Sequence, residues 1–151
     1  MVEGIKMREL SNQRLAKGMV LAVRSALASK QVQPAELMLS AIRLLWPDCP
    51  ELLELNATVL YMTFRSGEAL ALLHGHGDTR ALIIRAACLM RLNDPDWREP
   101  LMEVLKRNDD EIAVKCAHRL FEVSGESLPA LTSDSMSKSI QELIFFQGVK
   151  A

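Results

Sequence analysis

The stretch LLWPDCPELLEL, residues 44–55, interrupts a leucine-rich run with two prolines three residues apart. Pro47 disfavours the α conformation at Trp46, so a helix should end there. Pro50 suits the first position of a helix, where its missing N–H has no intrahelical partner. We therefore expect a tight connection between two helices, which usually places them antiparallel. Trp46, Pro47 and Pro50 are accordingly predicted to be structural.

The composition indicates an all-α protein. The chain has 151 residues, enough for one domain with a sizeable core. Hydrophobic residues make up 49% and aromatic residues 5%, and helix-favouring leucine, alanine, methionine, glutamate and arginine dominate. The formal net charge of −1 gives no electrostatic reason to expect nucleic-acid binding.

The chain start and the cysteines point to a cytoplasmic protein. The charged first residues lack the apolar region of a signal peptide, and no stretch is apolar for long enough to span a bilayer. The three cysteines, Cys49, Cys88 and Cys116, are too few and too scattered for a disulfide framework. A reduced, cytoplasmic protein without a transmembrane segment is expected.

Proline, glycine and apolar spacing predict a series of helices and a repeat. A second junction resembles the first, because Asp94 can cap a helix that Pro95 opens, and Trp97 can wedge there, so Pro95 and Trp97 are also predicted to be structural. A shift of 34 residues, the tetratricopeptide period, places Ala35 on Ala69. The predicted fold is therefore a right-handed, tetratricopeptide-like stack of antiparallel pairs with about six to seven helices. The expected helices span residues 18–29, 34–46, 51–65, 69–74, 80–92, 95–106 and about 111–123.

Two of these helices carry more apolar residues than one buried face requires. The helix over 51–65 has one stripe through Leu53, Ala57, Leu60 and Phe64 and a second beside it, and the helix over 80–92 is apolar nearly all round. Either both helices are central in a compact bundle, or the surplus forms a groove for a partner helix. On the second interpretation the predicted partner-binding residues are Leu52, Leu55, Val59, Met62, Ile83 and Met90.

The sequence offers little for catalysis or metal binding. His74 and His76 in HGHGD, with Cys116 and His118, lack the paired spacing of zinc ligands. No phosphate-binding loop or serine elbow is present, and Asp109 and Asp110 are expected to serve a helix N-terminus. We therefore predict no enzyme, no metal site and no cofactor; a metal-binding helical domain is the alternative from another class.

Three segments in order resemble a family of type III secretion proteins from Hrp and related systems. LLWPDCPELLEL (44–55) is similar to that family's proline-containing junction, RSGEALALL (65–73) to its arginine–glycine turn and helix, and LNDPDWREPLMEVL (92–105) to its GDPxW segment. Cys49 stands where the family's junction has phenylalanine. The resemblance covers about residues 18–120, and the family is related in fold to tetratricopeptide-like chaperones of the secretion needle.

The resemblance implies a binding role. Such a chaperone holds a needle or inner-rod subunit and prevents its premature polymerisation, often with a small helical co-chaperone. The alternative is a structural or regulatory adaptor of the secretion apparatus without chaperone activity.

The expected organisation is an extension (1–17), a helical domain (18–125) and a linker with a short amphipathic segment (126–151). In SIQELIFFQGVKA, residues 139–151, the apolar Ile140, Leu143, Ile144 and Phe146 have helical spacing. Because an exposed apolar segment favours aggregation, we expect it to be covered. Its cover could be its own domain, a co-chaperone or a second copy of the chain.

Overall fold

The computed structural model describes residues 2–125, and every regular element in this part of the chain is helical. The predicted all-α class is thus confirmed, whereas the segment over 139–151 lies outside the described residues. The elements are α1 (Val2–Ala28), α2 (Val32–Leu45), α3 (Leu52–Met62), α4 (Ser66–Leu73), α5 (Thr79–Arg91), the 3₁₀ helix η1 (Pro95–Trp97), α6 (Arg98–Arg107) and α7 (Glu111–Gly125).

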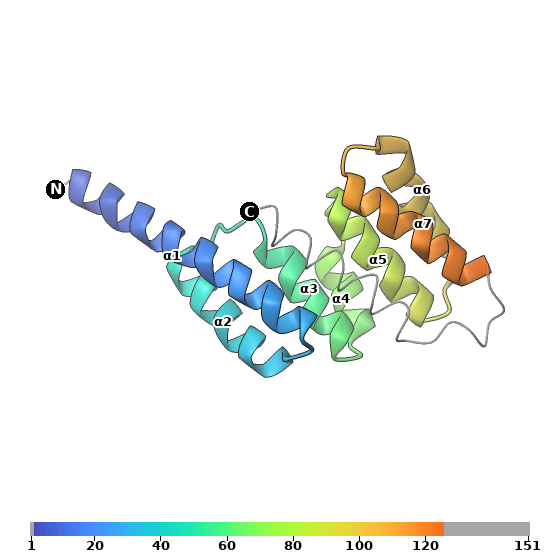
Figure 1. Cartoon of the computed structure of the whole chain (residues 1–151), viewed down its shortest axis with the longest axis horizontal. Coiled ribbons are helices and arrows are strands. Elements are labelled where there is room, and N and C mark those ends of the chain that lie inside the picture. The colour runs from blue at the N-terminus through green and yellow to red at the C-terminus, as the bar shows by residue number, and fades with distance from the viewer. Residues whose placement is uncertain (1, 126–151) are drawn as a thin grey trace.

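The helices pack in consecutive pairs that form a row (Figure 1). α1 packs on α2, α3 on α4 and α5 on α6, as the short connections predict. The first helices of the pairs also contact one another in succession, α1 with α3, α3 with α5 and α5 with α7. These four helices therefore form one layer, and α3 and α5 have neighbours on several sides.

The core runs along this layer and its contacts with α2, α4 and α6. Its largest fully buried side chains are Tyr61, Leu27, Ile42, Leu55, Leu73, Ile83, Ile84, Leu101 and Leu120. Burying one such leucine or isoleucine stabilises the folded chain by about 1.5–3 kcal/mol relative to leaving it exposed.

The junction at residues 44–55 ends one helix and starts the next, as predicted. α2 ends at Leu45, and the N–H of Trp46 still donates to the carbonyl of Ile42, at 2.7 Å. α3 begins at Leu52 rather than next to Pro50, because the chain first makes a turn in which the N–H of Leu52 donates to the carbonyl of Cys49. Pro50 therefore lies just before the helix and not at its first position.

α1, α3 and α5 end in the same backbone turn. Lys30, Phe64 and Asn93 follow these helices in the left-handed region, with φ of 61°, 61° and 56°. After each of them the next N–H donates to a carbonyl five residues back, which is the Schellman motif. These bonds are Gln31 to Ala26 at 2.8 Å, Arg65 to Leu60 at 2.8 Å and Asp94 to Leu89 at 2.9 Å. The first two turns keep the 34-residue period, and the third comes after only 29 residues.

Three polar contacts join neighbouring helices of the layer, each between residues 30 positions apart in sequence. Arg24 of α1 donates to Glu54 of α3 at 3.2 Å, and both side chains are nearly buried. Arg91 of α5 donates to the carbonyl of Tyr61. Arg80 of α5 donates from Nε to Asp110, before α7, at 2.7 Å. The polar contacts thus connect the units that apolar packing brings together.

Asp110 also caps α7, as its place before the helix predicts. Its Oδ1 accepts the backbone N–H groups of Ile112 and Ala113, at 3.1 and 3.2 Å. Partial burial raises the pKa of Asp110, but the bonds from Arg80 and the two amides outweigh it and hold the pKa below its ordinary value. Asp109 does not contact the helix end in this way; its carboxylate accepts the Thr79 hydroxyl at 2.8 Å.

Several helix boundaries differ from the expected ones. α1 begins at Val2, so residues 2–17 are its first half and extend beyond α2 (Figure 1). The core begins within that half, at the fully buried Ala16. α2 begins at Val32, so Pro34 is its third residue, where a missing N–H still costs no intrahelical bond. α4 begins at Ser66 rather than Ala69, because the carbonyl of Arg65 already accepts the N–H of Ala69 as the first bond of the helix, at 3.0 Å.

Trp46 and Trp97 are half-buried and pack against the core, and Pro47, Pro50 and Pro95 are exposed. The centres of the Trp97 ring and the Phe121 ring in α7 lie 5.4 Å apart, and the two ring planes are inclined by 59°. Alanine at either tryptophan should lower the free energy of unfolding by about 2 kcal/mol, roughly half the cost at a fully buried aromatic. Chemical denaturation measures this, and unchanged stability in both variants would contradict a structural role.

Candidate functional site

The six predicted partner-binding residues lie mainly inside the fold. Leu55 and Ile83 are 0% exposed, and Val59, Met90 and Leu52 are 5%, 7% and 8% exposed; only Met62 is half-buried. The reason is that α3 and α5 are central in the layer, so their surplus apolar faces meet neighbouring helices. In this conformation these residues do not line an open groove together, and a partner-binding role for them stays a prediction.

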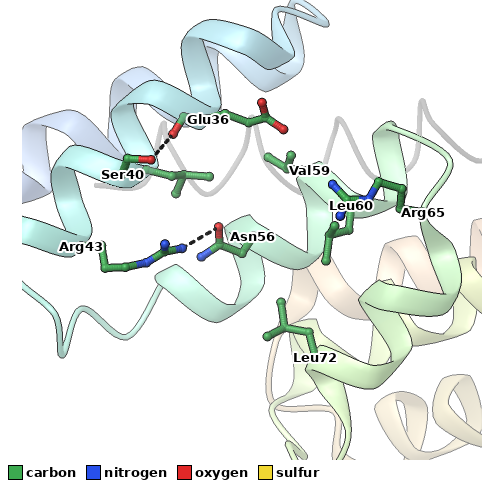
Figure 2. Close-up of a pocket in the computed structure, with 9 residues that line it drawn as sticks. Glu36, Ser40, Arg43, Asn56, Val59, Leu60, Arg65 and Leu72 are labelled. Atoms are coloured by element: carbon green, nitrogen blue, oxygen red, sulfur yellow. Dashed lines mark hydrogen bonds between the residues drawn. The ribbon is translucent and has the colours of Figure 1, made fainter.

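A groove is nevertheless present where α2, α3 and α4 meet, and Val59 is the one predicted partner-binding residue that lines it (Figure 2). We call it the α2–α4 groove; its volume is about 470 Å³. Apolar side chains from all three helices line it, and polar groups stand around them. The lining residues are Glu36, Leu39, Ser40, Arg43, Asn56, Val59, Leu60, Arg65 and Leu72.

The polar groups of the α2–α4 groove carry more positive than negative charge. Arg43 donates to the Asn56 side-chain oxygen at a long 3.4 Å, and among the described residues no carboxylate lies within ion-pairing distance of it. Asn56 is itself oriented by donating to the carbonyl of Leu52 at 2.8 Å. Arg65 pairs with Glu68, and both side chains are largely exposed. Glu36 also lines the groove and has no ion pair among the described residues, so the groove suits an apolar segment whose carboxylate lies at Arg43 and away from Glu36.

An exposed aromatic residue immediately precedes Arg65, one of the lining residues, in the chain. Phe64, which precedes Arg65, is 73% exposed and has a φ of 61°. A left-handed backbone costs a residue with a side chain roughly 1–2 kcal/mol, and a bulky one is rarely found there. The equivalent turns have Lys30 and Asn93. Phe64 thus combines backbone strain with an apolar ring in water, neither of which stabilises the fold.

The ring of Phe64 is held in place by a cation. The Arg91 guanidinium lies 3.7 Å from the centre of the buried Tyr61 ring and 4.8 Å from that of Phe64. Cation–π contacts of this kind are worth about 0.5–1 kcal/mol at exposed sites. Phe64 is therefore an exposed aromatic residue held in place by the fold, and aromatic residues including phenylalanine are enriched in the cores of protein interfaces.

The groups considered for catalysis or metal binding are dispersed. His74, His76 and His118 are exposed, whereas Cys116 is buried. Burial raises the pKa of Cys49, Cys88 and Cys116 to about 11 in each case. Residues 2–125 contain no group of three or more histidine, cysteine, aspartate or glutamate side chains placed to hold a metal ion. In the same range no helix has the length and apolarity needed to cross a bilayer.

Of the residues that line the α2–α4 groove, Val59 alone is among the predicted partner-binding residues, and Phe64 is not among them either. Phe64 was assigned to the apolar stripe of Leu53, Ala57 and Leu60, which supposes that the helix continues through it. The 34-residue shift places it on Lys30 in a turn, and this signal could have identified it as exposed.

The comparisons with known proteins agree with the order of motifs along the chain. A model of the family described as bacterial type III secretion protein (HrpB1_HrpK) matches residues 6–125. The match extends at both ends beyond residues 18–120, which carry the resemblance in sequence, and it includes most of α1. No curated protein and no solved structure gave a match. The three proline- and glycine-marked segments and the family match together show that this chain belongs to the bacterial type III secretion protein family HrpB1_HrpK.

Proposed function

We propose that this type III secretion protein is a cytoplasmic chaperone that binds a needle or inner-rod subunit and prevents its premature polymerisation. Its role is binding rather than catalysis. Phe64 is the observation that carries the proposal, because an exposed aromatic on a strained backbone is explained better by binding than by folding. A relation to tetratricopeptide-like needle chaperones, and a small helical co-chaperone, belong to the same proposal.

The physical requirement for such a chaperone is a surface that covers an amphipathic helix. A subunit that polymerises after export must have its assembly face shielded before export. The α2–α4 groove offers Leu60 and Leu72 as accessible apolar side chains between Arg43 and Arg65. The exposed ring of Phe64, in contact with Arg91 of α5, offers a further apolar contact. An apolar helix with an acidic residue fits the surface by the helix-in-groove mode.

A permanent adaptor of the secretion apparatus is the second candidate, and the first half of α1 favours it. Val2, Ile5, Met7, Leu10 and Leu15 are each at least 56% exposed in a segment that extends beyond α2 (Figure 1). A stable partner could cover this segment. Co-expression with the needle or inner-rod subunit distinguishes the two: a chaperone gives a soluble complex of defined stoichiometry and is absent from the assembled apparatus, whereas an adaptor remains within it.

Replacing Phe64 with asparagine should separate binding from stability. Asparagine tolerates the left-handed turn, as Asn93 does, so relief of strain should offset the lost contact with Arg91 and keep stability within about 1 kcal/mol. Loss of an aromatic anchor should weaken subunit binding by about 2–4 kcal/mol, or 30- to 1,000-fold. Titration calorimetry with the purified subunit measures the affinity.

The matched control is Lys30→Asn, which changes the equivalent turn at the end of α1. It should leave binding unchanged. Equal affinity of wild type and Phe64→Asn for the subunit would remove Phe64 from the binding surface, and equal loss in both variants would show that the effect is not specific to Phe64.

A further inference from the structure

The α2–α4 groove leaves apolar surface open in the described part of the chain. Leu72 of α4 is 37% exposed and Leu60 of α3 is half-buried, and both face the groove (Figure 2). The more deeply buried Leu39 and Val59 contribute to its lining. Arg43 stands at the groove without a carboxylate partner among the described residues. Glu36 lines the groove as well, so an occupant should supply apolar side chains and one carboxylate that reaches Arg43 rather than Glu36.

The end of α7, after which the remaining chain begins, lies beside the turn that follows α5. Ser124, near the end of α7, lines a cavity of about 320 Å³ together with Asn93 and Asp94 of the turn after α5. Arg91, at the end of α5, contacts the ring of Phe64. Arg65, which follows Phe64 in the chain, lines the groove. The end of α7 thus lies beside the turn after α5, and α5 in turn packs against α3, which lines the groove.

Axes of packed helices lie about 8–10 Å apart, so the two steps from α7 through α5 to α3 span roughly 20 Å, which the chain after α7 is long enough to cover. Residues 126–138 are polar for most of their length and precede the apolar segment over 139–151. Thirteen residues reach up to about 45 Å when extended. For comparison, the 27-residue helix α1 is roughly 40 Å long.

The chemistry of the apolar segment fits the groove. Ile140, Leu143 and Ile144 have the spacing of one helical face, and Glu142 is the only carboxylate side chain among residues 139–151. We infer that this segment docks in the α2–α4 groove of its own chain. Its apolar side chains cover Leu60 and Leu72, and Glu142 pairs with Arg43.

Docking would make the segment an internal competitor of the proposed cargo; this consequence, unlike the docking, rests on the proposed function. A subunit that binds the same groove must first displace the segment. Its apparent dissociation constant is then the intrinsic one divided by the fraction of chains in which the groove is free. The empty protein would meanwhile keep both apolar surfaces out of water.

Disulfide trapping in the full-length protein tests the docking without any subunit. A chain with Leu72→Cys and Ile144→Cys is oxidised with glutathione disulfide at low protein concentration. The native thiols of Cys49, Cys88 and Cys116 are buried and should compete poorly. The control chain carries Met102→Cys, on the exposed face of α6, with Ile144→Cys. We expect an intramolecular disulfide to form at least 10-fold faster in the first chain.

Equal rates in the two chains would overturn the inference, and so would a disulfide between two chains, which would place the segment on a second copy. A charge exchange gives an independent measurement that does not depend on how well the cysteine pair is aligned. Arg43→Glu, at an exposed position, should slow trapping at least 5-fold, and adding Glu142→Arg should restore it. Failure of the restoration would exclude the Arg43–Glu142 pair. Because no subunit is present, these results are separate from the outcome for Phe64→Asn.

Discussion

Replacing Glu54 with alanine should destabilise the fold by about 3–5 kcal/mol, because it leaves a buried guanidinium without its counter-charge. Arg24 is 3% exposed, and its Nη1 lies 3.2 Å from Oε1 of Glu54, whose side chain is 13% exposed. The Nη2 of Arg24 has no hydrogen-bond partner in the described structure, so Glu54 is its main compensation. Urea denaturation followed by circular dichroism measures the loss.

Two control chains show whether the cost belongs to the unpaired charge. The double variant Arg24→Met, Glu54→Leu removes both charges and keeps apolar volume, so it should recover most or all of the stability. Glu111→Ala breaks an exposed pair with Lys115, in which both side chains are 74% exposed, and should cost less than about 1 kcal/mol. A loss at Glu54→Ala no larger than at Glu111→Ala would contradict the buried pair.

Leu55→Ala should be the most damaging truncation on α3, at about 2–5 kcal/mol, because Leu55 is fully buried and neighbouring helices limit collapse of the cavity. Leu53 is half-buried, and its truncation should cost about half as much or less. The stripe interpretation from the sequence predicts the opposite order, with Leu53 in the core and Leu55 facing a partner. Thermal and chemical denaturation of both single variants distinguish the two.

Helix positions in this chain were predictable where proline or a charged cap decides them locally. Pro47 ends α2, and Asp94 accepts the N–H of Asp96 at 2.9 Å where η1 and α6 begin. These effects act within a few residues, so the sequence contains them. The pairing of the helices follows from the same short turns.

The faces of α3 and α5 could not be assigned in this way. Apolar periodicity shows that a face is buried but not what buries it, and these helices contact neighbours on several sides. The α2–α4 groove depends on side chains from three helices, and no local pattern reports such a juxtaposition. Phe64 was missed for another reason: its apolar spacing continues the stripe of α3, while the backbone has already left the helix.

The three buried thiols have a consequence for the conditions that the protein tolerates. With a pKa of about 11, roughly one thiol in ten thousand is ionised at pH 7, and only the thiolate attacks a disulfide or an oxidant. Because Cys88 and Cys116 lie in packed helices and Cys49 is buried at the junction between α2 and α3, mixed disulfides with small thiols should form only as fast as the fold opens. Oxidative damage at cysteine thus becomes a measure of how often the fold opens, unlike oxidation of the exposed Met7 and Met102, which needs no opening.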